Sequence, residues 1–338
     1  MDKFDVILLS GGGIKGIGEL GVLHYHHEKG RLDLEHAKEY VASSVGSLIC
    51  LLMVCGYTPM EIFTKAYTTT NFFKPSDVNN IWDVFSKYGI MSIQPLIDIV
   101  EEMVKRKFNK LPTLLELKEL TGKTLTVAAV NVTKTRVEYF NYETRPTLGA
   151  VEAVKISCNL PIIFHRISYA GNYWVDGGLI DSFPYEAVKN TTGNILGVVV
   201  MGTDTEERKD TFINYLYTLL TITINAMTQL RTKNLGKNVT LIKMVFNNAS
   251  ILNLTMSSTK KMDMFMKGYH NAQREQEKEI LIVTGWRWEE ERKAKELSES
   301  HPWGIDIPNK DHDGWEDEQW ESTFGISETN LQLSKKKD

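Results

Sequence analysis

The stretch Val6-Ile7-Leu8-Leu9-Ser10-Gly11-Gly12-Gly13-Ile14-Lys15-Gly16 decides the fold: four apolar residues run into a glycine-rich turn. The pattern recurs at Tyr40-Val41-Ala42-Ser43-Ser44-Val45-Gly46, where a second apolar run ends in small residues. An apolar, helix-like segment follows each turn. Two strand-to-helix turns of this kind predict an α/β fold in which helices cover a parallel sheet. In such folds, function is expected at the carboxyl ends of the strands.

The rest of the chain continues this alternation and predicts a single three-layer α/β/α domain with a mostly parallel central sheet. We expect strands at 4–9, 40–43, 125–132, 136–141, 195–200 and 239–246, and helices at 16–29, 44–55, 92–108, 150–157, 212–230 and 259–281. The fourth of these strands follows the third closely enough to form a hairpin. Between residues 58 and 91 the pattern loosens, and its aromatic residues predict either a lid over a site or a surface loop.

The composition changes after Gly285. Five of the seven tryptophans follow that residue, interleaved with charged residues and loop formers. We therefore predict a domain at 1–285 and a divergent, tryptophan-rich C-terminal extension at 286–338. Many of its residues are acidic, which favours docking on the chain itself or on a protein partner over binding to an anionic membrane.

Length and charge exclude several classes of protein. The chain has 338 residues and a net charge of −4, whereas nucleic-acid binders usually show a basic excess. No run approaches the roughly 20 apolar residues that span a bilayer, and the first apolar run is too short for a signal peptide. Three cysteines are too few for a disulfide framework and indicate buried thiols in a reducing compartment. We expect a cytoplasmic protein whose membrane contact is limited to the surface.

The glycine-rich turn is typical of an anion site, because successive backbone N–H groups and the following helix N-terminus converge there. It also matches the GxGxxG pattern of dinucleotide sites, but Asp33 and Glu35 lie before the second strand, where that fold needs an acidic residue at the strand's end. A P-loop needs lysine where Ile17 stands. A nucleotide-binding protein stays open as a less favoured alternative.

Two further motifs carry reactive side chains. Ala42-Ser43-Ser44-Val45-Gly46 fits the nucleophile elbow G-x-S-x-G, in which a sharp strand-to-helix turn exposes the serine hydroxyl, except that alanine replaces the first glycine. Trp174-Val175-Asp176-Gly177-Gly178 places an aspartate at a strand end before two glycines, which permit close approach to another loop. The turns after the first two strands thus suggest an oxyanion hole and a serine nucleophile.

In order and context, these motifs resemble those of the patatin-like phospholipase family. The resemblance covers residues 4–281 and rests on the GGGxKG loop, on Ser44 with its elbow, and on Asp176 with the two glycines that follow. Residues 153–164, a Ser…Pro…Phe stretch shortly before the aspartate, add support. Ala42 is the departure, since the family usually has glycine there.

The resemblance implies a catalytic dyad and a lipid acyl hydrolase without a cofactor. The sequence contains no EF-hand loop and no metal-ligand cluster, so we expect the reaction to be independent of calcium. Ser44 would attack an acyl ester, of a phospholipid or of another lipid, and Asp176 would accept its proton within hydrogen-bond reach. The amides of Gly11, Gly12 and Gly13 would form the oxyanion hole. Because a free aspartate is a weak base, burial would have to raise its pKa. Five residues would support the site: Lys15, Gly16, Gly46, Gly177 and Gly178. For Lys15, a solvated side chain is an equal alternative.

Besides the nucleotide-binding alternative, this interpretation has two rivals. A Ser-His-Asp hydrolase needs a histidine after the acid, and only His270, His301 and His312 follow Asp176, none of them in a catalytic-loop setting. The second rival is a catalytically silent protein that keeps the fold and binds lipid or a partner, which Ala42 and the C-terminal extension motivate.

Overall fold

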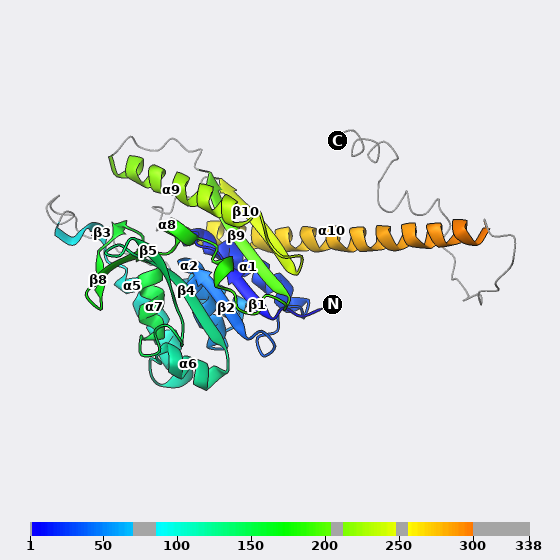
Figure 1. Ribbon diagram of the computed structural model, residues 1–338. Helices are drawn as coiled ribbons and strands as arrows, with labels where there is room; N and C mark the ends of the chain where they lie inside the picture. Colours follow the sequence, from blue (N-terminus) through cyan, green and yellow to red (C-terminus); the bar gives the residue numbers. More distant parts are fainter. Residues whose placement is uncertain (1, 70–85, 204–211, 248–255, 300–338) are drawn as a thin grey trace. The chain divides into compact units, whose positions relative to one another are not determined.

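The computed structural model describes residues 2–69, 86–203, 212–247 and 256–299 (Figure 1). The chain divides into two compact units, Met1–Ile280 and Leu281–Asp338, and the second is described only as helix, up to Glu299. Residues 70–85 of the segment predicted as a lid or loop lie outside the described residues, as do three of the tryptophans of the predicted extension. The fold described below is that of the first unit.

The centre of the molecule is a sheet whose described strands run in the order β10-β9-β1-β2-β4-β8-β7, with β5 paired to β4. Its strands are β1 (Val6–Leu9), β2 (Glu39–Ser43), β4 (Thr124–Asn131), β5 (Arg136–Phe140), β7 (Ile167–Tyr169), β8 (Asn172–Asp176), β9 (Ile195–Thr203) and β10 (Val239–Asn247). The five strands from β10 to β4 are parallel, whereas β5 and β8 pair antiparallel with β4. Two short strands, β3 (Gly89–Met91) and β6 (Ile162–Phe164), pair separately.

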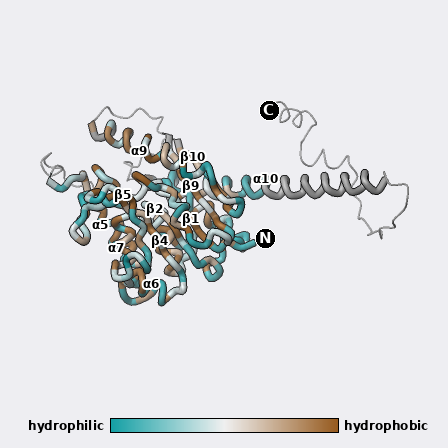
Figure 2. Tube along the Cα trace, in the orientation of Figure 1, coloured by the Kyte–Doolittle hydropathy of each residue, from teal (hydrophilic) through white to brown (hydrophobic). Residues whose placement is uncertain are grey.

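Helices cover the sheet on both faces (Figure 1). The described helices are α1 (Gly16–Glu28), α2 (Val45–Val54), α3 (Pro59–Thr68), α5 (Gln94–Phe108), α6 (Leu114–Thr121), α7 (Ala150–Ser157), α8 (Gly178–Asp181), α9 (Phe212–Arg231) and α10 (Ser258–Glu299), with 3-10 turns at Gly13–Lys15 and Tyr185–Ala187. Hydrophobic residues occur along most of the length of α9 (Figure 2). This arrangement confirms the predicted α/β/α architecture with its mostly parallel sheet.

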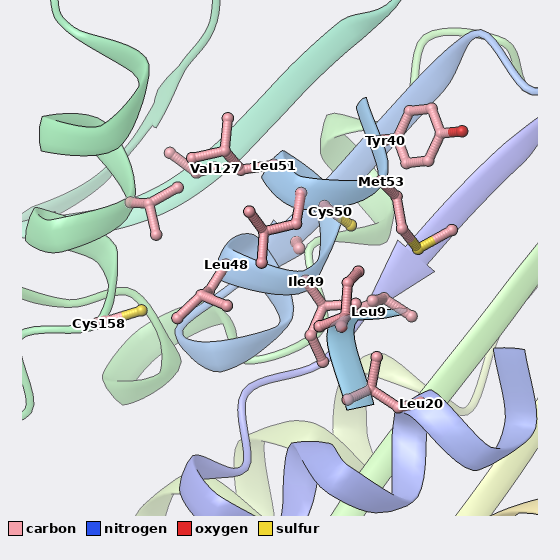
Figure 3. Packing of buried hydrophobic residues seen from close by; sticks show 14 of the residues in the cluster. Leu9, Leu20, Tyr40, Leu48, Ile49, Cys50, Leu51, Met53, Val127 and Cys158 are labelled. Atoms are coloured by element: carbon pink, nitrogen blue, oxygen red, sulfur yellow. The ribbon is translucent and has the colours of Figure 1, made fainter. Parts of the chain in front are cut away.

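The alternation of side chains along β1 explains the layers, because successive residues of a strand point to opposite faces. Ile7 and Leu9 belong to the large core beneath α1 and α2, and Leu9 and Leu20 pack there beside the side chains of α2 (Figure 3). Val6 and Leu8 belong to a smaller core on the other face, with Phe183. All four β1 residues are fully buried, as expected for a central strand of a parallel sheet.

Two features were not predicted. Helices α3 and α6 each begin with a capping box, from Thr58 with Glu61 and from Thr113 with Glu116. The β7–β8 hairpin brings Asp176 opposite Ala129 of β4. Among the described residues, no helix combines the length and the apolarity needed to cross a membrane.

Candidate active site

Ser44 occupies the sharp turn between β2 and α2, and its backbone is strained there. Its φ of 52° and ψ of −134° lie outside the regions that non-glycine residues usually adopt. Gly46 allows the turn to close, since a Cβ at that position would lie 2.5 Å from the Ser10 carbonyl oxygen. Ala42 is fully buried in β2 between Leu9 and Val127. The elbow geometry is thus present with alanine in place of the first glycine.

The Ser44 hydroxyl meets the carboxylate of Asp176 directly. Ser44 Oγ donates a hydrogen bond to Asp176 Oδ2 at 2.5 Å, the contact that the sequence predicted. The other carboxylate oxygen accepts the N–H of Gly178 at 2.7 Å, and Gly177 makes the intervening turn. No ring nitrogen in the described part of the chain hydrogen-bonds to either side chain, and His270 is exposed on α10.

Asp176 is only 3% exposed, and this burial raises its pKa from 3.8 to about 6. The hydrogen bonds from Ser44 and Gly178 oppose the shift, because they stabilise the ionised form. A carboxylate with this pKa is ionised at neutral pH and is a stronger base than a solvated aspartate.

The last residue of α7 and the turn that follows it hold the nucleophile and the acid in register. Ser157 Oγ accepts the backbone N–H of Ser44 at 3.0 Å and donates to the Ala128 carbonyl at 2.7 Å. The carbonyl of Asn159 accepts the N–H of Asp176 at 2.9 Å. Sequence reasoning did not assign either residue a role, although both belong to the Ser…Pro…Phe stretch quoted above.

The glycine-rich turn lies against the elbow. A Cβ at Gly11 would come within 3.0 Å of Ser44 Cβ, and Gly16 begins α1 beside Val45. Gly13 has a φ of 56°, in the left-handed region that favours glycine. The N–H of Gly11 donates to the Ser182 carbonyl at 3.0 Å, whereas in the described part of the chain no acceptor is assigned to the N–H of Gly12 or Gly13.

Lys15 is 4% exposed, so the interpretation of a solvated side chain is wrong. Its ammonium group lies against the backbone of β9, where a Cβ at Gly202 would come within 1.8 Å of Lys15 Nζ. Since Lys15 lies two residues after Gly13, this packing attaches the loop to the carboxyl end of the neighbouring strand β9.

A cavity of about 180 Å³ opens at these residues. Ser44, Asp176 and the three loop glycines line one part of it. The remaining wall is mostly apolar and includes Ile14, Ile17, Leu20, Val45, Leu48, Ile49, Ile62, Leu96, Leu160, Phe164, Val200 and Ile224. Figure 3 shows Leu20, Leu48 and Ile49 of this wall together with the nearby Cys158. The described residues contain no group of His, Cys, Asp and Glu side chains placed to hold a metal ion.

Comparison with known proteins identifies a family and several relatives. A family model described as patatin-like phospholipase matches residues 7–189. The probable lipid hydrolase 463L of Invertebrate iridescent virus 6 is 32% identical over 185 residues, which cover 54% of this chain and 62% of the viral protein. The uncharacterized protein YqhO of Bacillus subtilis (strain 168) is 23% identical over 228 residues, or 61% and 75% of the two chains.

Among solved structures, VipD from Legionella pneumophila matches with a TM-score of 0.49 and 16% identity, over 81% of this chain and 66% of that one. The chain therefore spans less than two thirds of both the viral relative and VipD. The family model, in contrast, covers more than half of this chain and includes the glycine loop, the elbow and Asp176. The chain belongs to the patatin-like phospholipase family.

Proposed function

We propose that this protein is a lipid acyl hydrolase that cleaves fatty acyl esters of phospholipids or lysophospholipids with Ser44 and Asp176 as its dyad. The observation that carries the proposal is the 2.5 Å hydrogen bond between Ser44 Oγ and Asp176 Oδ2 at the wall of an apolar cavity. Membership of the family and the name of the viral relative, a probable lipid hydrolase, support the same class of reaction.

The geometry supports a two-step reaction. Ser44 Oγ attacks the ester carbonyl carbon while its proton moves to Asp176 Oδ2, and the carbonyl oxygen becomes an oxyanion. When the tetrahedral intermediate collapses, the alcohol part leaves with the proton from Asp176, and the acyl group stays on Ser44. Water then attacks the acyl-enzyme and gives its proton to Asp176. The fatty acid leaves, and Ser44 recovers its proton.

The oxyanion would be stabilised chiefly by the amides of Gly12 and Gly13. Each such donor contributes about 3–4 kcal/mol to the transition state in serine hydrolases. The N–H of Gly11 is already engaged by Ser182, so its role in our proposal is to fix the loop. None of these steps uses a metal ion, which makes the proposed reaction independent of calcium.

A lipid panel tests the function. Wild-type protein and Ser44→Ala are incubated with phosphatidylcholine, lysophosphatidylcholine and triacylglycerol vesicles or emulsions in the presence of a calcium chelator, and released fatty acid is measured. We expect release from at least one phospholipid by wild type only. Equal release by both proteins would refute the dyad.

A fluorophosphonate probe distinguishes this enzyme from a catalytically silent protein of the same fold. Wild type should be labelled at Ser44, and Ser44→Ala should not. Absence of labelling in the wild type, with no hydrolysis of any lipid, would favour the silent alternative.

We also propose that residues 286–338 form a separate extension, and that the protein is cytoplasmic and meets lipid at the membrane surface. Subcellular fractionation tests the location, and co-sedimentation of full-length protein with phosphatidylcholine vesicles tests the surface contact.

A further inference from the structure

Glu19 on α1 is a fully buried carboxyl group that the proposed mechanism does not use. Its Oε1 lies 3.2 Å from Ser10 Oγ, and Ser10 directly precedes the glycine loop. In the described part of the chain, no basic side chain forms an ion pair with Glu19, and its Oε2 has no hydrogen-bond partner. A carboxylate in such surroundings is costly, so the group is expected to be neutral. Burial raises the pKa of Glu19 well above its ordinary value, and the bonds from Ser10 oppose this only in part.

The neutral form determines how the Ser10 hydroxyl is used. Ser10 Oγ accepts the N–H of Val200 at 2.9 Å. It lies in donor position both to the Gly11 carbonyl at 3.1 Å and to Glu19 Oε1 at 3.2 Å, but its single proton can serve only one of them. A neutral Glu19 donates to Ser10 Oγ, which leaves the Ser10 proton for Gly11. If Glu19 is ionised, or is replaced by a side chain without a donor, nothing reserves the Ser10 proton for the Gly11 carbonyl.

The Gly11 carbonyl shares its peptide unit with the N–H of Gly12. In a trans peptide these two groups point in opposite directions, and the described part of the chain has no cis peptide bond. Holding the carbonyl on Ser10 therefore turns the Gly12 N–H away from Ser10. Gly12 lines the cavity, and Gly11 is fixed on its other side by the bond of its N–H to the Ser182 carbonyl.

We propose that Glu19 is a positioning residue that acts through Ser10 to orient the Gly12 N–H toward the oxyanion. This inference rests on the proposed function, since it assigns Glu19 to the same site. The hydrogen-bonded path runs from Glu19 to Ser10, to the Gly11 carbonyl and to the Gly12 amide.

Replacing the donor tests this path. Glu19→Gln keeps an N–H donor at the position of the carboxyl O–H, whereas Glu19→Met keeps the approximate shape and removes the donor. Ser10→Ala breaks the next link, and Glu28→Met, an exposed position on the same helix, is the control. The readouts are kcat and KM for p-nitrophenyl butyrate and the Ki of an alkyl trifluoromethyl ketone, whose adduct with Ser44 places an oxyanion in the hole. Ser44→Ala is included.

We expect Glu19→Gln to stay within about twofold of wild type. Because complete loss of one oxyanion donor costs about 10²–10³ in kcat, a misdirected donor should cost about 10–100-fold in Glu19→Met and Ser10→Ala. KM should change little, and Ki should rise by the same factor as kcat falls, because both report binding of the oxyanion.

Equal losses in Glu19→Gln and Glu19→Met, or a change in KM with Ki constant, would overturn the inference. If Glu19→Met does not fold, Ser10→Ala decides by the same criteria. Full activity in Ser44→Ala would instead refute the proposed function, so the two failures are distinguishable.

Discussion

Asp176 and Asp181 lie five residues apart, and the same interaction is found at both. Each carboxylate is buried and accepts a 2.5 Å hydrogen bond from a hydroxyl, Asp176 from Ser44 and Asp181 from Tyr139. For both carboxylates, burial is the main cause of a raised pKa.

Their surroundings differ. Arg231 Nε lies 3.6 Å from Asp181 Oδ1, whereas no basic side chain of the described residues pairs with Asp176. Asp176 lines the cavity with Ser44, and Asp181 does not. Burial also raises the pKa of Tyr139, so its phenol stays a donor. A short hydrogen bond to a buried carboxylate is thus insufficient evidence of a dyad, and access to substrate and the absence of a counter-charge separate the two pairs.

The largest expected difference between the pairs is in activity. Ser44→Ala or Asp176→Asn should lower kcat for p-nitrophenyl butyrate by about 10⁴-fold, because nucleophile and base act as one unit. Asp181→Asn is the matched control and should stay within about threefold of wild type. Comparable losses in Asp181→Asn and Asp176→Asn would show that the comparison assigns the wrong carboxylate to catalysis.

The second difference is in stability. The pKa of Asp176 rises from 3.8 to about 6 on folding, so the folded protein binds more protons between these values and loses stability as the pH rises through them. One pKa unit corresponds to about 1.4 kcal/mol, so ionised Asp176 costs about 3 kcal/mol at pH 8.

Asp176→Asn removes this cost. Its free energy of unfolding in urea, relative to wild type, should rise by about 2.4 kcal/mol between pH 4 and pH 8, because part of the cost is already present at pH 4. Asp181→Asn should gain less, since it also removes the ion partner of Arg231. A difference between Asp176→Asn and wild type that does not vary with pH would mean that Asp176 has an ordinary pKa in the folded protein.

Removal of the Tyr139 hydroxyl should lower the stability of the protein and leave its activity unchanged, whereas removal of the Ser44 hydroxyl should chiefly lower activity. Tyr139→Phe leaves an oxygen of the buried Asp181 without its donor, which should lower the free energy of unfolding by about 2 kcal/mol. Its kcat/KM should match wild type, because Tyr139 does not line the cavity. Urea unfolding and ester hydrolysis on the same preparation check both parts. A kcat/KM as low as that of Ser44→Ala would remove the distinction between the pairs.

The sequence predicted the features that depend on local pattern. Apolar runs ending in glycine or serine identified β1 and β2, and the small residues around Ser44 identified the elbow. The α3 helix carried an equally local signal, Thr58 followed by proline and Glu61, which was overlooked within an irregular segment.

Contacts between residues that lie far apart along the chain could not be predicted from the sequence. The bond from Ser44 N to Ser157 Oγ spans 113 positions, and the Gly11 N–H is engaged by Ser182 only because β8 pairs antiparallel with β4 and brings residue 182 back to the loop. The burial of Lys15 depends likewise on β9 lying beside β1. No periodicity encodes such pairs, so the residues that fix the site needed the folded arrangement.

The smallest predicted effect is on the pH dependence of hydrolysis. Asp176 must be ionised to accept the Ser44 proton, so kcat/KM should be level above pH 7, fall to half near pH 6 and be about tenfold lower at pH 5. Asp181→Asn should leave this midpoint unchanged, because Asp181 binds Tyr139 rather than the nucleophile. The profile is measured with p-nitrophenyl butyrate, with unfolding checked at each pH. A midpoint below pH 4 would mean that burial does not raise the pKa of Asp176. A shift of the midpoint in Asp181→Asn would mean that the two carboxylates titrate together and cannot be assigned separate roles.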